Sequence, residues 1–158
     1  MSVEKIAEIL TENNLKLAVA ESCTGGLISS LFTDVAGASK YIEQNFVTYS
    51  AASKIAILGV NPETIERFGV VSEEVAKEMA QGLIKRRGAD FALSTTGVLG
   101  PEAQGGIPAG TVFIGLASKS TTKTIKYISN EKTRIAIKQD IARFAIKVLC
   151  EFIESARV

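Results

Sequence analysis

Histidine is absent from this sequence of 158 residues, and tryptophan is absent as well. Without histidine, the chain cannot build a Ser-His-Asp triad, a Cys-His pair or a zinc site that relies on imidazole ligands. Any hydrolytic chemistry must therefore move protons with lysine, tyrosine or a carboxylate. Cysteine is also scarce. Cys23 and Cys150 lie far apart and form no C-x-x-C motif, which favours a reducing, cytoplasmic location.

An excess of charge of either sign is missing too. The chain has 18 lysine and arginine residues against 17 aspartate and glutamate residues, a formal net charge of +1. That balance provides no excess of positive charge that would bind nucleic acid or an anionic membrane surface, so we expect neither as a partner. No apolar run approaches the roughly 20 residues of a membrane span, and the acidic first residues lack the pattern of a signal peptide.

The composition and the periodicity are those of a globular α/β protein, with 46% hydrophobic and 22% charged residues. Helices alternating with buried strands predict a three-layer α/β/α sandwich with a mixed β-sheet, which forms a single domain over residues 1–158. Apolar spacing and capping signals predict helices over residues 3–13, 25–33, 51–58, 62–69, 73–87 and 131–155, the last capped by Asn130, and strands over residues 15–20, 44–49, 89–95, 111–117 and 122–128.

Ser22 directly follows a buried strand and precedes a helix in this predicted fold. Strand ends form crevices in open α/β sheets, and the free N–H groups of a helix start stabilise an alkoxide, an oxyanion or a phosphate. Gly25 and Gly26 leave the backbone of that first turn open to a ligand. Alternatively, Ser22 is only the N-cap of the helix. Cys23 is a rival nucleophile, because a thiol at a helix start has a lowered pKa.

Tyr49 ends the second predicted strand, and Lys54 follows in a short helix, where it is flanked by alanine and isoleucine. A free lysine, with a pKa of about 10.4, is neutral in about one molecule in 2,500 at pH 7. Burial lowers that pKa and makes lysine a usable base. If the two strands are neighbours, Ser22, Tyr49 and Lys54 meet at one sheet edge and form the site of a Ser-Lys hydrolase. The alternative is a solvated lysine on a surface helix.

A loop over residues 95–110 follows the third predicted strand and contains five glycines and two prolines. Such a loop offers backbone N–H groups and hydroxyls to an anion or a carbonyl. It matches neither the P-loop motif nor the Rossmann motif. A long glycine loop in a compact domain favours a functional role.

Five stretches together resemble the CinA C-terminal domain family, in the expected order and over nearly the whole chain. They are Ala20–Gly26, Phe46–Ser50 with Lys54, Gly69–Ser72, Thr96–Pro101 and Gly105–Val112. The characterised members of the family are nicotinamide-nucleotide amidohydrolases. The resemblance therefore implies an α/β/α sandwich that hydrolyses the carboxamide of nicotinamide mononucleotide, giving nicotinic acid mononucleotide and ammonia.

The same resemblance assigns roles to residues of this chain. Ser22 matches the family nucleophile, Lys54 the base and Tyr49 the assisting tyrosine. The resemblance implies no metal, no cofactor, a small nucleotide substrate and a homo-oligomer. The residues expected to bind the nucleotide are Glu21, Cys23, Thr24, Gly25, Gly26, Thr96, Gly97, Gly100, Gly105, Gly106 and Arg134.

Three departures from the family pattern bear on the substrate. The Gly-Asp-Arg-like stretch that opens the last helix in the family reads Glu131-Lys132-Thr133-Arg134 here. Leu99 replaces a smaller residue in the glycine loop, and Lys138 stands where the family has a second arginine, four residues after Arg134. Lysine cannot reproduce the bidentate grip of arginine on a phosphate or carboxylate. Two other functions therefore stay open: a non-catalytic sensor that binds pyridine nucleotides, and a Ser-Lys peptidase or general amidase.

Overall fold

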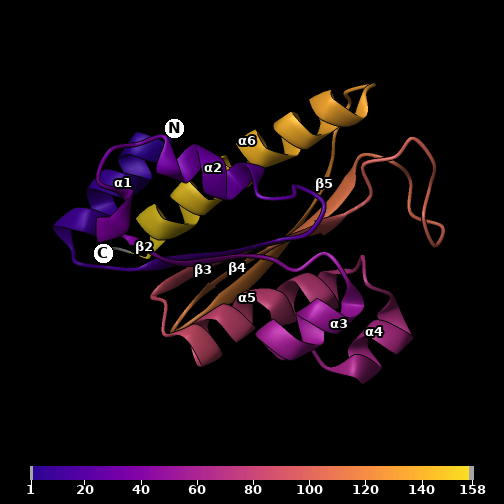
Figure 1. Cartoon of the computed structure of the whole chain (residues 1–158), viewed down its shortest axis with the longest axis horizontal. Helices are drawn as coiled ribbons and strands as arrows, with labels where there is room; N and C mark the ends of the chain where they lie inside the picture. The colour runs from indigo at the N-terminus through magenta and orange to yellow at the C-terminus, as the bar shows by residue number, and fades with distance from the viewer. Residues whose placement is uncertain (1, 157–158) are drawn as a thin grey trace.

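The computed structural model describes residues 2–156, which form three layers (Figure 1). A mixed sheet of five strands is the middle layer, and helices cover both of its faces, so the predicted α/β/α sandwich is confirmed. The strands, in their order across the sheet, are β2 (Ile42–Val47), β1 (Leu17–Glu21), β3 (Phe91–Gly97), β4 (Thr111–Ser118) and β5 (Thr122–Ile128).

The strand β1 lies between β2 and β3 and is parallel to both, whereas β4 and β5 are antiparallel to their neighbours. All five residues of β1 are buried, as expected for an apolar strand that is covered on both faces. Because three neighbouring strands are parallel, their carboxyl ends lie at the same edge of the sheet. The loops that follow these strands can therefore converge on one site.

The helices form two groups on opposite faces of the sheet (Figure 1). Each group buries apolar side chains against the sheet, which gives two hydrophobic cores. A short 3-10 helix, η1 (Ala38–Lys40), precedes β2 and was not predicted. The first group is α1 (Val3–Glu12), α2 (Leu27–Thr33) and α6 (Arg134–Ser155), and the second is α3 (Ala51–Ser53), the π-helical turn η2 (Lys54–Leu58), α4 (Pro62–Phe68) and α5 (Glu73–Arg87).

Several predicted boundaries are wrong by one to three residues, those of β1 and β3 among them, and two of these differences have a local cause. The strand β2 ends at Val47, two residues before the predicted end, because Thr48 turns away from the sheet after its N–H group bonds to the Glu21 carbonyl at 2.8 Å. The last helix is capped by Thr133 and not by Asn130, since the Thr133 hydroxyl accepts the Ala136 N–H group at 3.2 Å. The first of these differences matters for the site, because it frees the backbone carbonyl of Thr48.

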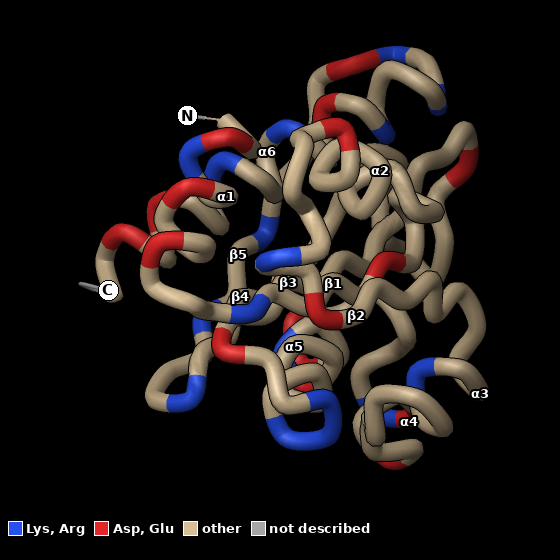
Figure 2. The backbone as a smooth tube through the Cα atoms, turned by 60° about the vertical axis from the view of Figure 1, so that its left-hand side comes forward, with Lys and Arg blue, Asp and Glu red and all other residues tan. Residues whose placement is uncertain are grey.

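Within residues 2–156, no helix combines the length and the apolar character that crossing a membrane requires. Figure 2 shows acidic and basic residues interspersed along the backbone. The basic run at residues 85–87 lies in the last turn of α5, where cations interact favourably with the helix dipole. The structure thus gives this run an ordinary structural role.

Candidate active site

Ser22 and Lys54 meet at the edge where the three parallel strands end. Ser22 directly follows β1, and its N–H group donates to the Thr95 carbonyl of β3 at 3.1 Å. Lys54 lies seven residues after the last residue of β2, Val47, and its Nζ is 3.0 Å from the Ser22 Oγ atom. Since β1 and β2 are neighbours in the sheet, two side chains separated by 32 positions come within hydrogen-bond distance.

The Lys54 amine is fully buried and is surrounded by oxygen atoms that carry no formal charge. Its Nζ donates to the Thr48 carbonyl at 2.6 Å and to the Tyr49 carbonyl at 3.4 Å. Among the described residues, no carboxylate forms an ion pair with it. Burial lowers the pKa of Lys54 from 10.5 to about 8, so about one molecule in ten carries a neutral amine at pH 7.

The geometry around Nζ suits both protonation states of Lys54. A neutral amine has two N–H donors and one lone pair. The carbonyls of Thr48 and Tyr49 can accept the two donors, which leaves the lone pair for the Ser22 hydroxyl. An ammonium can donate to all three oxygens from the same position. The pair can therefore exchange a proton without moving the lysine chain.

The π-helical turn η2 fixes the position of Lys54. Ser50 caps the preceding turn, because its hydroxyl accepts the Ser53 N–H group at 3.1 Å. The Lys54 carbonyl accepts the Val60 N–H group at 3.3 Å, and Leu58 packs in the core below the sheet. Single π-helical turns are frequent at functional sites. Here the turn holds a buried lysine against the end of β1.

Glu21 occupies the N-terminus of α2. Its fully buried carboxylate accepts the N–H groups of Gly26 at 3.1 Å, Ile28 at 3.1 Å and Ser29 at 2.8 Å, and the Ser29 hydroxyl at 2.7 Å. These are the free N–H groups that the sequence led us to place next to Ser22. The expectation that this helix N-terminus stabilises charge at Ser22 is therefore wrong, because a carboxylate already binds there.

The turn between β1 and α2 presents other donors. Gly25 and Gly26 precede the helix, with φ angles of 62° and 100° that side chains other than glycine adopt only with strain. The Gly25 N–H group donates to the Ser22 carbonyl at 3.1 Å, so it is not available to a ligand. The N–H groups of Cys23 and Thr24 donate to no oxygen among residues 2–156. They are the donors that a developing oxyanion at Ser22 could use.

Cys23 is buried beside Ser22, and burial raises the pKa of its thiol to about 12. The lowered pKa expected from a helix start is therefore wrong. A protonated thiol is a poor nucleophile at neutral pH. Cys23 contributes instead to the hydrophobic core and to the wall of the adjoining cavity.

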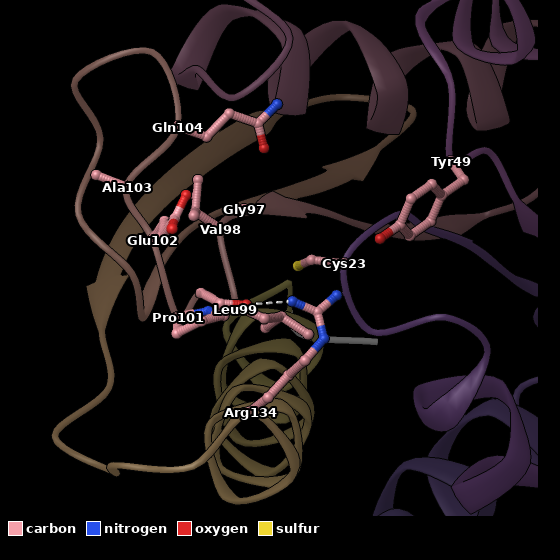
Figure 3. Close-up of a pocket in the computed structure, with 11 residues that line it drawn as sticks. Cys23, Tyr49, Gly97, Val98, Leu99, Pro101, Glu102, Ala103, Gln104 and Arg134 are labelled. Carbon is pink, nitrogen blue, oxygen red and sulfur yellow. Dashed lines mark hydrogen bonds between the residues drawn. The ribbon is translucent and has the colours of Figure 1, made fainter.

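A cavity of about 490 Å³ opens beside this turn (Figure 3). Cys23 lies at its inner end, the Tyr49 ring borders it, and the loop after β3 and the start of α6 complete it. Ser22 itself is only 7% exposed and is not among the lining residues. Of the residues expected to bind the nucleotide, Cys23, Gly97, Gly100 and Arg134 line the cavity.

Other predicted binding residues serve the framework. The Thr24 hydroxyl lies 3.0 Å from the Thr95 hydroxyl, and the Thr96 hydroxyl donates to the Val70 carbonyl at 2.9 Å. These threonines are fully buried. Their hydrogen bonds tie the turn after β1 to β3 and the segment before α5 to the sheet. None of these residues lines the cavity.

Gly105 and Gly106 form the tip of a small hairpin that extends away from the sheet. The flanking residues Gln104 and Ile107 exchange two backbone hydrogen bonds, at 3.0 Å and 2.9 Å. The φ angles of the two glycines, 57° and 78°, are those of a type I′ turn. The structure thus explains this glycine pair by turn geometry, and neither glycine lines the cavity.

Two residues of the site were not found from the sequence. The Thr48 carbonyl holds the Lys54 amine, and the buried Thr48 hydroxyl has no hydrogen-bond partner within the described residues. Glu102 places a carboxylate on the wall of the cavity (Figure 3). A backbone carbonyl has no signature in a sequence, whereas Glu102 could have been noticed as the single carboxylate of the glycine loop.

Basic residues reach the site from α6. The Arg134 guanidinium donates to the Gly100 carbonyl and borders the cavity (Figure 3). Lys138 lies one turn further along, and its Nζ would be 3.6 Å from a Cβ atom placed on Gly25. Leu99 and Lys138, which both depart from the family pattern, thus lie at this site. Within residues 2–156, no three cysteine, aspartate or glutamate side chains are grouped to hold a metal.

These features define a class of protein: a three-layer α/β/α domain with a buried serine–lysine pair where parallel strands end. The model of the CinA C-terminal domain family matches residues 1–153, and the chain belongs to that family. A CinA-like protein of Chlorobium limicola is 50% identical over 125 residues, which are 78% of this chain and 29% of that protein. A CinA-like protein of Chlorobium chlorochromatii is 46% identical over 153 residues, 94% of this chain and 35% of that protein.

Solved structures agree with this assignment. A CinA superfamily protein of Escherichia coli has a TM-score of 0.91 and 34% identity, over 95% of this chain and 87% of that chain. One from Klebsiella pneumoniae 700603 has a TM-score of 0.92 and 30% identity, over 97% of this chain and 96% of that chain. By contrast, the chain spans about a third of the length of the curated relatives that it matches.

Proposed function

We propose that this domain hydrolyses the carboxamide of nicotinamide mononucleotide to nicotinic acid mononucleotide and ammonia, with Ser22 as nucleophile and Lys54 as base. The observation that carries the proposal is the buried Lys54 amine, 3.0 Å from the Ser22 hydroxyl, with a pKa lowered to about 8. Such an amine is a competent base near neutral pH. We further propose that the domain serves pyridine nucleotide salvage as a cytoplasmic homo-oligomer.

In the first half of the proposed reaction, neutral Lys54 accepts the proton of the Ser22 hydroxyl, and the Ser22 Oγ atom attacks the amide carbon. The carbonyl oxygen becomes an oxyanion that the N–H groups of Cys23 and Thr24 stabilise. The protonated Lys54 then donates its proton to the amide nitrogen. The C–N bond breaks, ammonia leaves, and an acyl-enzyme on Ser22 remains.

In the second half, Lys54 is neutral again and accepts a proton from a water molecule. The resulting hydroxide attacks the acyl carbon, and the same two N–H groups stabilise the second oxyanion. Lys54 returns the proton to the Ser22 Oγ atom as the ester bond breaks. The products are the carboxylic acid and the free enzyme, so atoms and charge balance. We assign to the hydroxyl of Tyr49, which borders the cavity, the role of orienting the amide.

An ammonia-release assay over a panel of pyridine nucleotides and simple amides tests the proposal. We expect release from nicotinamide mononucleotide by the unaltered protein. The Ser22→Ala and Lys54→Ala variants should each lose at least about a thousandfold in turnover while they still bind the nucleotide. Retention of substantial turnover by either variant would refute the assignment. Faster release from amides that lack phosphate would indicate a general amidase.

A non-catalytic sensor of pyridine nucleotides is a second candidate. It is favoured by the burial of Ser22, which is 7% exposed and stands outside the cavity lining. A sensor would bind the nucleotide in the same cavity and release no ammonia. The assay therefore separates the two functions, provided that binding is measured on the same preparation.

A further inference from the structure

Glu102 and Arg134 bring opposite charges to one cavity without pairing. They are the two charged residues among those that line it, and they come from different elements, the loop after β3 and the start of α6 (Figure 3). The Arg134 guanidinium donates to the Gly100 carbonyl and not to the carboxylate. Among the described residues, neither forms an ion pair. A cavity that holds both charges apart is complementary to a ligand that carries both.

The loop that carries Glu102 is braced at both ends. At its base, the Gly110 N–H group donates to the Val98 carbonyl at 2.7 Å. Nearer its tip, Gln104 and Ile107 exchange the backbone hydrogen bonds of a short antiparallel bridge. Glu102 lies between these two ties, so its backbone is held in place even though its side chain is exposed. A carboxylate with a fixed backbone position can favour a ligand that carries a positive charge at a matching place.

An aromatic ring borders the same cavity. Tyr49 is 62% exposed, and in Figure 3 its ring lies across the cavity from the loop that carries Glu102. The face of an aromatic ring attracts cations, planar ones included. Cys23, next to the proposed nucleophile, lies between the two sides. A flat cationic ring could thus contact Tyr49 and face Glu102 while its substituent points toward Ser22.

We infer that Glu102 is a specificity-determining residue that recognises the fixed positive charge of a pyridinium ring, while Arg134 recognises the phosphate of the same ligand. This inference rests on the proposed function, because it concerns the substrate of the same site. It adds a selection between two forms of one nucleotide. The pyridinium form should bind better than the 1,4-dihydropyridine form, which keeps the phosphate and the amide but has a neutral ring.

Calorimetric binding in the Ser22→Ala background tests the inference without turnover. The ligands are nicotinamide mononucleotide and its 1,4-dihydro form. We expect Glu102→Gln to weaken binding of the pyridinium form by about threefold to fivefold and to leave binding of the neutral form unchanged. The matched control is Glu131→Gln, which removes an exposed carboxylate that lies outside the cavity. That control should change neither affinity.

Three results would overturn the inference. An equal loss of affinity for both ligands in Glu102→Gln would indicate a structural role for Glu102. Unchanged affinity for both would show that Glu102 does not contact the ligand. Failure of both ligands to bind the Ser22→Ala protein would show that the cavity takes another ligand. Ammonia release by the unaltered protein is measured separately. A protein that discriminates the two ring charges and releases no ammonia would retain the inference and refute the proposed hydrolysis.

Discussion

The buried serine–lysine pair beside the cavity and the exposed rim of the cavity contrast in burial and in hydrogen bonding. The pair, Ser22 and Lys54, does not line the cavity and is called the floor below. It is at least nine-tenths buried, and its polar atoms bond to the protein. The rim, formed by Tyr49, Glu102 and Arg134, is exposed, and its charged groups form no ion pair among the described residues. Burial of the floor lowers the pKa of Lys54.

This difference indicates a division of labour. Removal of a group from the floor should affect the chemical step and the free energy of unfolding, because both depend on a buried charge. Removal of a group from the rim should affect mainly KM, because solvent screens the interactions there. The following experiments test this contrast, from the largest expected effect to the smallest.

Lys54→Met should abolish turnover, because the variant has no base near Ser22. We expect kcat for ammonia release to fall by at least about ten-thousandfold, while the KM changes by less than about threefold. The matched control is Lys147→Met, which alters an exposed lysine on α6. Steady-state kinetics of both variants provide the measurement. A large change in KM with kcat retained would contradict the claim that the floor acts on the chemical step and the rim on binding.

The same Lys54→Met substitution should stabilise the fold at neutral pH. The pKa of Lys54 is about 8 in the folded chain and near 10.5 in the unfolded chain, so the unfolded chain binds more protons between these values. Stability of the unaltered protein therefore rises with pH across this window. Burial of the Lys54 ammonium lowers the free energy of unfolding by about 3 kcal/mol at most, and this loss is complete below about pH 8.

Urea unfolding at several pH values measures this effect. We expect the Lys54→Met protein to be more stable at pH 7 and the advantage to shrink as the pH approaches 10. Lost hydrogen bonds to the carbonyls of Thr48 and Tyr49 reduce the gain. A variant that is less stable than the unaltered protein at every pH would show that Lys54 is not destabilised by burial.

Glu21→Gln should weaken both the fold and the turn that presents Ser22. A glutamine side chain keeps one acceptor oxygen, but its NH₂ group would face the N–H groups of α2. We expect a loss of about 2 kcal/mol in stability and about tenfold in kcat. The midpoint of the pH profile should stay near 8, because Lys54 keeps its surroundings. A shifted midpoint would mean that Glu21 acts on Lys54 directly.

Arg134→Lys should raise the KM for the nucleotide by about tenfold and leave kcat nearly unchanged, because lysine cannot form two parallel hydrogen bonds to a phosphate. The matched control is Arg143→Lys, on an exposed position of α6 outside the cavity. Kinetics with the corresponding nucleoside, which lacks the phosphate, should show no difference between Arg134→Lys and the unaltered protein. A fall in kcat would show that Arg134 takes part in the chemical step at Ser22 and Lys54, contrary to this prediction.

Cys23→Ala should have the smallest effect. The thiol has a pKa raised to about 12 and supplies no nucleophile, so turnover should fall by less than about threefold. Loss of a small core side chain should cost about 1 kcal/mol of stability. A loss of turnover as large as that of Ser22→Ala would transfer the nucleophilic role to the thiol.

The sequence predicts that Ser22 and Lys54 meet if their strands are neighbours in the sheet, and the structure shows that β1 and β2 are neighbours. Both follow predicted strands, and parallel strands bring their carboxyl ends to one edge. The apolar neighbours of Lys54 also indicated its burial. The alternation of predicted helices and strands was sufficient to predict the three layers, because the apolar periodicity of each segment agrees with the fold.

Other features depend on contacts that no local pattern encodes. Glu21 folds back onto residues 26–29, so the helix start that resembled an anion site is already occupied. Burial overrides the effect that a helix start was expected to have on Cys23. The start of α6 was missed because Asn130 and Thr133 are both acceptable caps, and only the tertiary path of the chain decides between them.

The pKa of Lys54 is the quantity on which the proposed chemistry depends. It can be measured by an NMR titration that follows the side-chain carbon next to the Lys54 amine in protein with ¹³C-labelled lysine, with Lys54→Met used to assign the signal. The structure predicts a midpoint of about 8. A midpoint near 10.5, the value of a solvated lysine, would contradict a buried base at Ser22 and with it the proposed hydrolysis.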